Sequence, residues 1–229
     1  MLYCISALGG VADMASHINL DFLHSQNITV EEAIRIIEHV NHYDVGVVIN
    51  GVRWATRNVD APGTFAATPA SSGRFFQWNR RQGWVAPAAN TFAPGWDISR
   101  PTGTVWLTVN DPCPVGWRLP SRAELQSLNN AGSAWATFNG VPGRVYGTAP
   151  NQIFLPAAGF IVGTTTAFGF DGRGSLASAG TSGFYWSFTN AGSFGFDGAN
   201  AVVLHFRSAT SSVTDERRVN GFSVRCVAE

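Results

Sequence analysis

The sequence predicts an α+β domain, and two kinds of local signal support that prediction. Two segments, Thr29–Glu32 and Ser121–Glu124, have the capping-box pattern, in which a hydroxyl and a carboxylate each bond a free amide at the start of a helix. Elsewhere, short apolar runs alternate with Gly, Pro, Asn and Asp, which is typical of strands joined by turns and loops. Few helices among many short strands favour the α+β class.

The first helix is expected from about Val30 to Asn41. Its apolar side chains recur at helical spacing, at Ala33, Ile36, Ile37 and Val40. Such a stripe must pack on the main domain or on a partner chain, so this helix could join copies of the chain into a homo-oligomer. We therefore expect an N-terminal helical segment over residues 1–49 and a ligand-binding domain over residues 50–229.

The second helix is expected to begin after Pro120, to turn Leu125 and Leu128 inward, and to end at Asn129–Gly132. The strands are predicted from short runs rich in β-branched and aromatic residues. They are Val45–Trp54, Ile153–Ala157, Phe184–Ser187, Ala201–Phe206 and Ser223–Val227.

Charge and hydropathy exclude some functions. The 15 basic residues, all of them Arg, balance 15 acidic residues, so the chain lacks the cationic surplus of a nucleic-acid binder. No apolar run is long enough to span a membrane, so we expect no transmembrane segment. The first basic residue is Arg35, and a start without a basic region predicts that this chain carries no signal peptide.

The cysteines allow more than one interpretation. Cys113 and Cys226 could form a disulfide that leaves Cys4 unpaired, or all three could be thiols. No CxxC or HExxH spacing occurs, so we expect neither a metal site nor a cofactor. Phe168–Gly172 is repeated as Phe194–Gly198, and each Asp-Gly pair predicts a tight turn, because a calcium loop would need more carboxylates.

A set of motifs follows in a recognisable order from Asn50 onward. They are Gly51–Val59, Phe76–Asn79, Asn110–Pro120, Leu155–Gly159, Tyr185–Ser187 and Gly221–Val227. Together they resemble the Fibrobacter succinogenes major paralogous domain, a family common in Bacteroidetes that is similar to the formylglycine-generating-enzyme branch of the C-type lectin fold. The resemblance implies a C-type-lectin-like fold with two helices, short antiparallel strands and long loops. It also implies that Cys226 and its partner belong to the scaffold.

These motifs also have a physical interpretation. The segment Cys113–Pro120 would form a kinked, extended approach to the second helix, with Trp117 as a core anchor. We expect Arg118 and Arg225 to be buried pairing or capping groups rather than catalytic ones, because Arg keeps its charge and bonds carbonyl oxygens in a fork. Three further tryptophans are expected in the core, namely Trp54, Trp78 and Trp186.

The resemblance raises an enzymatic alternative, a formylglycine-generating-enzyme-like oxidoreductase. That chemistry requires two redox-active cysteines near the C-terminus, where this chain has only Cys226. No nucleophile elbow, P-loop or Ser-His-Asp order occurs either, so we expect no catalytic residues. The calcium-binding motifs of sugar-binding lectins are also absent. A second alternative is a structural fibre or pilus component.

The C-terminal part is similar to the variable proteins of diversity-generating retroelements, which end in a Tyr-Trp-Ser strand, a diversified stretch and Gly-x-Ser-Val-Arg-Cys. In those systems adenines in Asn-type codons are randomised, which excludes Lys, Glu, Gln, Met and Trp. None of these five residue types occurs from Phe188 to Asp215. The resemblance implies a diversified recognition surface in this stretch.

Alternation along the strand Ala201–Arg207 assigns one set of side chains to the core and the other to solvent. Val202, Leu204 and Phe206 form the expected core set. Phenylalanines among small polar residues resemble the chemistry of antibody loops, although they could also fold back into a minor core. The predicted ligand-binding residues are Phe184, Phe188, Phe194, Phe196, Asp197, Val203, His205, Arg207 and Thr210.

We therefore expect a receptor- or ligand-binding protein of a phage tail tip or a bacterial surface. It would act on the extracellular face, and its partner would be a protein or a glycan on a target surface.

Overall fold

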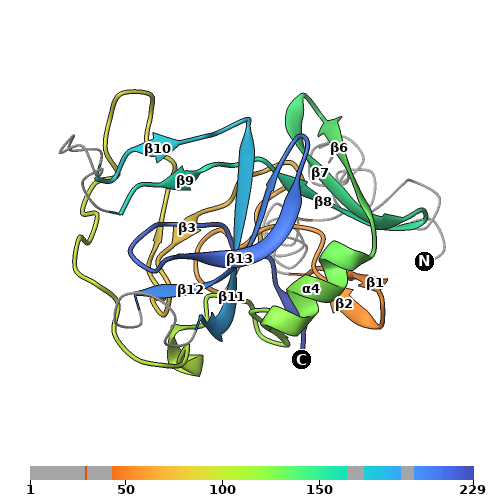
Figure 1. The fold of residues 1–229 in the computed structure, drawn as a ribbon, viewed down its shortest axis with the longest axis horizontal. Coiled ribbons are helices and arrows are strands. Elements are labelled where there is room, and N and C mark those ends of the chain that lie inside the picture. The colour runs from red at the N-terminus through yellow and green to blue at the C-terminus, as the bar shows by residue number, and fades with distance from the viewer. Residues whose placement is uncertain (1–28, 30–42, 164–172, 192–198) are drawn as a thin grey trace.

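A computed structural model describes residue 29 and residues 43–163, 173–191 and 199–229 (Figure 1). Strands occupy 40% of the described residues, and the one α-helix among them is α4 (Arg122–Asn130), with a short 3-10 turn, η1 (Thr108–Asn110). The expected α+β, C-type-lectin-like arrangement of two helices with short strands is therefore wrong, because this part of the chain is mostly antiparallel β. The predicted helix Val30–Asn41 and both Phe-Gly-Phe-Asp-Gly repeats lie outside the described residues.

The described strands form three larger sheets and two small ones. The terminal sheet has the order β1 (Val47–Ile49), β2 (Val52–Trp54), β14 (Val227–Ala228), β5 (Trp117–Arg118). The outer sheet comprises β6 (Ser133–Phe138), β7 (Val141–Thr148) and β8 (Asn151–Pro156). The central sheet comprises β11 (Ser182–Asn190), β12 (Asn200–Arg207) and β13 (Ser211–Arg217). The small sheets pair β3 (Phe75–Phe76) with β4 (Gly83–Trp84), and β9 (Phe160–Ile161) with β10 (Leu176–Ala177).

Two hairpins turn on Asn-Gly pairs, and sequence reasoning missed both. Asn50 and Gly51 have φ of +49° and +80°, and Asn139 and Gly140 have φ of +50° and +77°. Two successive residues with positive φ suit the tight turn of a two-residue hairpin. The predicted single strand Val45–Trp54 is therefore the β1–β2 hairpin, and the boundary expected between residues 49 and 50 falls inside it.

The central sheet is packed on both faces. One face contributes Tyr185, Leu204 and Phe206 to a hydrophobic cluster that also holds Trp54 and the inner side of α4. The other face contributes Phe184, Trp186 and Val203 to a second cluster, around Trp78 and Phe222. Figure 1 shows the three strands in the middle of the molecule, between the outer sheet and the β3–β4 and η1 loops. A sheet covered on both sides needs apolar residues at successive positions, and β12 has them.

Helix α4 begins as the sequence predicts. The Ser121 hydroxyl accepts a bond from the Glu124 amide, and Glu124 Oε2 accepts one from the Ser121 amide at 2.7 Å. Leu125 and Leu128 are buried, as expected from their spacing. Arg118 pairs with both carboxylate oxygens of Glu124, at 2.7 and 3.0 Å, but its side chain is 38% exposed, so the expectation that Arg118 is buried is wrong.

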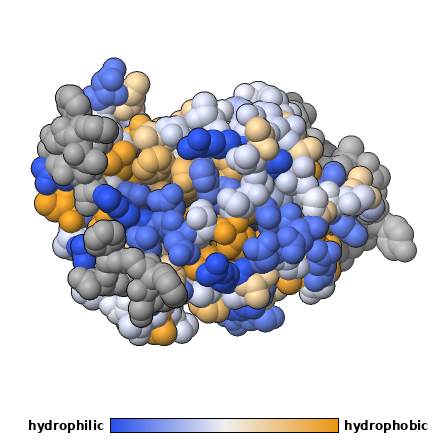
Figure 2. All heavy atoms as spheres, in the orientation of Figure 1, coloured by the Kyte–Doolittle hydropathy of each residue, from blue (hydrophilic) through white to orange (hydrophobic). Residues whose placement is uncertain are grey.

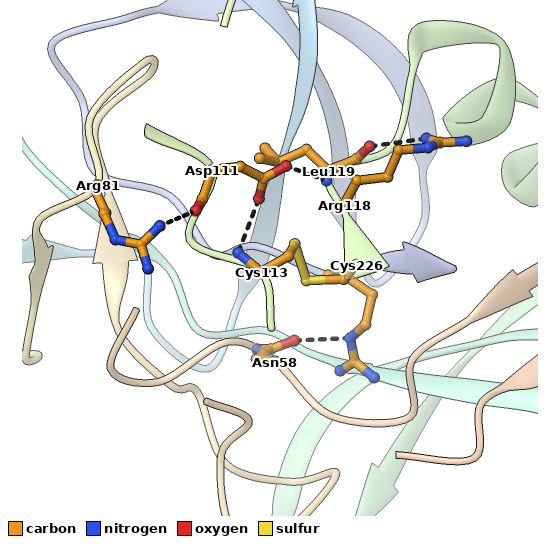
Figure 3. The surroundings of a disulfide bond; sticks show 8 residues. Asn58, Arg81, Asp111, Cys113, Arg118, Leu119 and Cys226 are labelled. Carbon is orange, nitrogen blue, oxygen red and sulfur yellow. Dashed lines mark hydrogen bonds between the residues drawn. A yellow bond between two sulfur atoms is a disulfide. The ribbon is translucent and has the colours of Figure 1, made fainter. Parts of the chain in front are cut away.

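A disulfide joins Cys113 to Cys226 and so attaches the segment before β5 to the C-terminal strand (Figure 3). Beside it, the Asp111 carboxylate accepts bonds from the Cys113 and Leu119 amides, and burial raises the pKa of Asp111. The neighbouring Arg225 is buried as predicted. Its guanidinium donates to Asn58 Oδ1 and to the carbonyls of Ala55 and Phe154.

Tryptophans contribute to both of the hydrophobic clusters that flank the central sheet. Trp54, Trp78 and Trp186 are fully buried, as predicted, whereas Trp117 is only half-buried and packs edge-on against Phe65. No helix in the described ranges is long and apolar enough to cross a membrane.

Candidate ligand-binding site

Phe184 lies in the core rather than on the expected recognition face. Its ring stacks on His205 at 4.3 Å between centroids and on Phe222 at 4.9 Å, and Phe160 meets it edge-on. The side chain is 6% exposed. The prediction that Phe184 faces solvent is wrong, because a second layer of aromatic residues covers this face of the central sheet.

Val203 is also buried. It pairs with Trp186 on β11 and with Thr214 on β13, and it belongs to the same cluster as Trp78. Alternation correctly places Val203 on the opposite face of the strand from Val202 and Leu204, but it does not show which face is exposed to solvent. The expected exposure of Val203 is therefore wrong for the same reason as that of Phe184.

His205 is half-buried on β12, between these buried residues and the end of the strand. Its Nε2 is enclosed and has no hydrogen-bond partner. Burial lowers the pKa of His205, and the nearby charge of Arg207 lowers it further. The neutral imidazole therefore suits this position, where it serves mainly as a ring stacked on Phe184.

Arg207 and Thr210 are exposed where β12 turns into β13. Arg144 on β7 anchors the main chain of this turn through hydrogen bonds. Its Nη1 donates to the Arg207 carbonyl at 2.7 Å and to those of Ser208 and Thr210 at 3.2 and 3.4 Å, while its Nε donates to the Ser133 hydroxyl. We call this turn, residues 207–210, the tip: its main chain is anchored by Arg144 and its side chains are exposed.

Phe188 is exposed at the other end of the central sheet, as predicted. The preceding Ser187 is buried, and its carbonyl accepts the indole N–H of Trp78 at 3.2 Å. Trp78 also meets Trp106 edge-on at 5.6 Å between centroids. On either side of the buried Trp106, Val105 and Leu107 are 59% and 49% exposed.

Val105 and Leu107 thus adjoin Trp106 along the chain, and Phe188 adjoins Ser187, the partner of Trp78; we call these three exposed residues the Phe188 surface. Figure 1 shows the η1 segment beside the lower end of β11, in agreement with these contacts. On the face drawn in Figure 2, hydrophobic residues reach the surface in separate patches bordered by hydrophilic ones. Sequence reasoning missed Val105 and Leu107. Their alternation with Trp106 was the available signal.

The predicted residues do not form one patch. Trp186 pairs with Val203 and Asn190 with Ala201, so Phe188 is level with the middle of that interval. Arg207 is about five residues farther along the strand, or roughly 17 Å at the usual rise. Phe188 and the Arg207–Thr210 tip are therefore separate surfaces. Phe194, Phe196 and Asp197 lie outside the described residues, in the segment that connects β11 to β12.

Arg218 lies beside Trp78 and is 2% exposed. Its guanidinium carbon lies 4.0 Å from the centroid of the Trp78 ring, its Nε donates to the Asn200 carbonyl, and its Nη1 donates to the Gly103 carbonyl at 2.6 Å. Its Nη2 is buried and has no partner, and the same is true of Trp106 Nε1. Burial lowers the pKa of Arg218.

No group of three or more metal-ligating side chains occurs within the described ranges. Comparison with protein-family models, with curated proteins and with solved structures finds no match to this chain.

Proposed function

We propose that this chain is a receptor- or ligand-binding protein and that the Phe188 surface is its principal contact region. The observation that carries the proposal is the exposure of three large apolar side chains next to residues of one buried tryptophan contact: Val105 and Leu107 flank Trp106, and Phe188 follows Ser187, which bonds Trp78. Exposed apolar groups on a fixed scaffold favour binding, because they are desolvated on contact and lose little conformational freedom. The partner would be a protein or a glycan on a phage host or a bacterial cell.

The backbone around this surface is well anchored. The Phe188 amide donates to the Pro120 carbonyl at 2.9 Å, and the Thr189 hydroxyl accepts a bond from the Arg122 amide at the start of α4. The Leu107 amide donates to Asn79 Oδ1 at 2.8 Å, next to Trp78. These bonds support a preorganised contact region, in which less entropy is lost on binding.

We also propose that residues 188–215 are diversified, and the packing of β12 limits where. Ala201, Val202, Val203 and Leu204 are fully buried, so substitutions there would disturb the core. Phe188 and the tip from Arg207 to Thr210 are exposed and can vary without that cost. Variation should therefore fall at Phe188 on β11 and at the turn that ends β12, and should spare residues 201–204.

Sequencing this region in closely related strains tests the diversification. We expect substitutions at Phe188 and at residues 207–210, an invariant 201–204 segment, and a neighbouring reverse-transcriptase gene with a template repeat. An identical 188–215 segment in all strains, or substitutions spread evenly over buried and exposed positions, would refute it.

A further inference from the structure

Two buried N–H donors that have no acceptor among the described residues lie beside Trp78. They are Arg218 Nη2 and Trp106 Nε1. Arg218 lies over the Trp78 ring, Trp106 meets the same ring edge-on, and Arg218 Nη1 bonds the carbonyl of Gly103, three residues before Trp106. Buried donors are nearly always satisfied in folded proteins, so an unsatisfied pair at one place suggests an acceptor that binds there.

Among the described residues, Arg218 also has no anionic partner. Its partners are two carbonyl oxygens and an aromatic ring, and none of the ion pairs formed among the described residues includes it. The contrast with Arg57 is informative, because Arg57 is equally buried and pairs with Asp44. A buried cation without an anion is costly, and an oxyanion would remove that cost.

We propose that Arg218 and Trp106 form an anion-binding site that takes a carboxylate or phosphate group. Arg218 Nη2 supplies a charged donor and Trp106 Nε1 a neutral one, while Trp78 and the apolar side chains nearby exclude water. Charge-assisted bonds of this kind are the strong ones, particularly where water is excluded. The ligand of the Phe188 surface would then carry an acidic group next to an apolar one. This last step rests on the proposed function.

The loop that closes over Arg218 provides a route of entry. Thr102, Gly103, Thr104, Val105 and Leu107 are exposed, and only Pro101 and Trp106 between residues 101 and 107 are buried. Segments with few buried side chains open at little cost in free energy. A local shift of the exposed residues 102–104, with Trp106 and Leu107 kept in place, would give a small anion access to the guanidinium.

Titration of the full chain with inorganic phosphate tests the site without a target molecule. Calorimetry and thermal unfolding would be measured at about 10 mM phosphate, against sodium chloride of equal ionic strength. At this concentration the general stabilising effect of phosphate on proteins is small. Wild type should bind phosphate and gain thermal stability. Arg218→Gln and Trp106→Phe should each weaken binding about tenfold or more, the loss expected for one good hydrogen bond to a charged group.

Arg53→Gln is the matched control. It removes an exposed guanidinium on β2, in the terminal sheet, and should leave phosphate binding unchanged. If Arg218→Gln does not fold, the test rests on Arg218→Lys, which keeps the charge, and on Trp106→Phe, which keeps an aromatic ring. Absence of phosphate binding by wild type, or binding by Trp106→Phe equal to that of wild type, overturns the proposal. If the protein binds acetate and phosphate in solution but recognises no acidic group on cells, the site is one for free ions.

Discussion

The guanidinium of Arg144 donates a 2.7 Å hydrogen bond to the main-chain carbonyl of Arg207, and so joins the outer sheet to the turn of the central sheet. Arg144 is a buried residue on β7, and Arg207 is exposed at the end of β12. The two residues are 63 positions apart in the sequence, and the Arg144 side chain also bonds the carbonyls of Ser208 and Thr210 in the same turn. The tip therefore owes its shape to a residue outside the C-terminal stretch.

Arg144→Ala should destabilise the fold by about 2–4 kcal/mol, because it removes a buried, packed side chain together with its hydrogen bonds to three carbonyls of the turn. Hydrogen exchange at Ser208 and Ser211 should become faster. Arg207→Ala is the control: its side chain is exposed, and its main-chain carbonyl is kept, so its effect should stay within about 0.5 kcal/mol. Urea unfolding of both variants checks this, and equal stability of the two would contradict the bracing role.

Reduction of the Cys113–Cys226 disulfide should lower stability by about 2–5 kcal/mol. The bond spans 113 residues, so its loss frees a long loop in the unfolded chain. The double variant Cys113→Ala, Cys226→Ala should unfold at a lower urea concentration than wild type, and added reductant should affect only wild type. An unchanged urea midpoint after complete reduction would show that the bond contributes nothing.

Glu124→Gln should destabilise the protein at pH 7 by about 1–2 kcal/mol, through loss of the capping-box charge and of the pair with Arg118. These contacts lower the pKa of Glu124 from 4.5 to about 2. A depressed folded-state pKa gives stability that is present above pH 4.5 and is lost as the pH falls toward 2. The difference between wild type and variant should therefore shrink from pH 5 to pH 2, and a constant difference would argue against the assignment.

His205 should make stability depend on pH closer to neutrality, around pH 6.5. Its pKa in the folded protein is below 6.5, so the unfolded chain takes up its proton first and stability falls as the pH decreases through 6.5. His205→Phe keeps a ring to stack on Phe184 and removes the titration. Thermal unfolding at pH 7.5 and 5.5 should show a smaller loss for His205→Phe than for wild type, and an equal loss would exclude His205 as the cause.

Local signals in the sequence predicted much of the scaffold. The Ser121–Glu124 capping box begins α4, Trp54, Trp78 and Trp186 are buried as expected, and the strand Ala201–Phe206 falls within β12. The β6–β7 hairpin was missed because its alanines, glycines and threonines give little hydrophobic contrast. Its Asn139-Gly140 turn was the stronger signal.

The candidate site was harder to predict, because exposure depends on the second layer. Alternation assigned Val203 to solvent and Phe184 was predicted to bind ligand, but distant residues such as Phe222 and Trp78 cover them. Val105 and Leu107 join Phe188 only through Trp78, a contact between segments far apart in the chain. Such tertiary contacts are not encoded in any local pattern.

Binding of the labelled chain to intact cells from a panel of bacterial isolates tests the central claim most directly. On isolates that bind wild type, Phe188→Ser and Leu107→Ser should each weaken binding about tenfold or more, as expected for apolar side chains buried at a contact. Val115→Ser, which changes a fully exposed apolar residue before β5, should bind like wild type. Unchanged binding by Phe188→Ser and Leu107→Ser, or no binding to any isolate, would contradict the proposal that the Phe188 surface recognises a target.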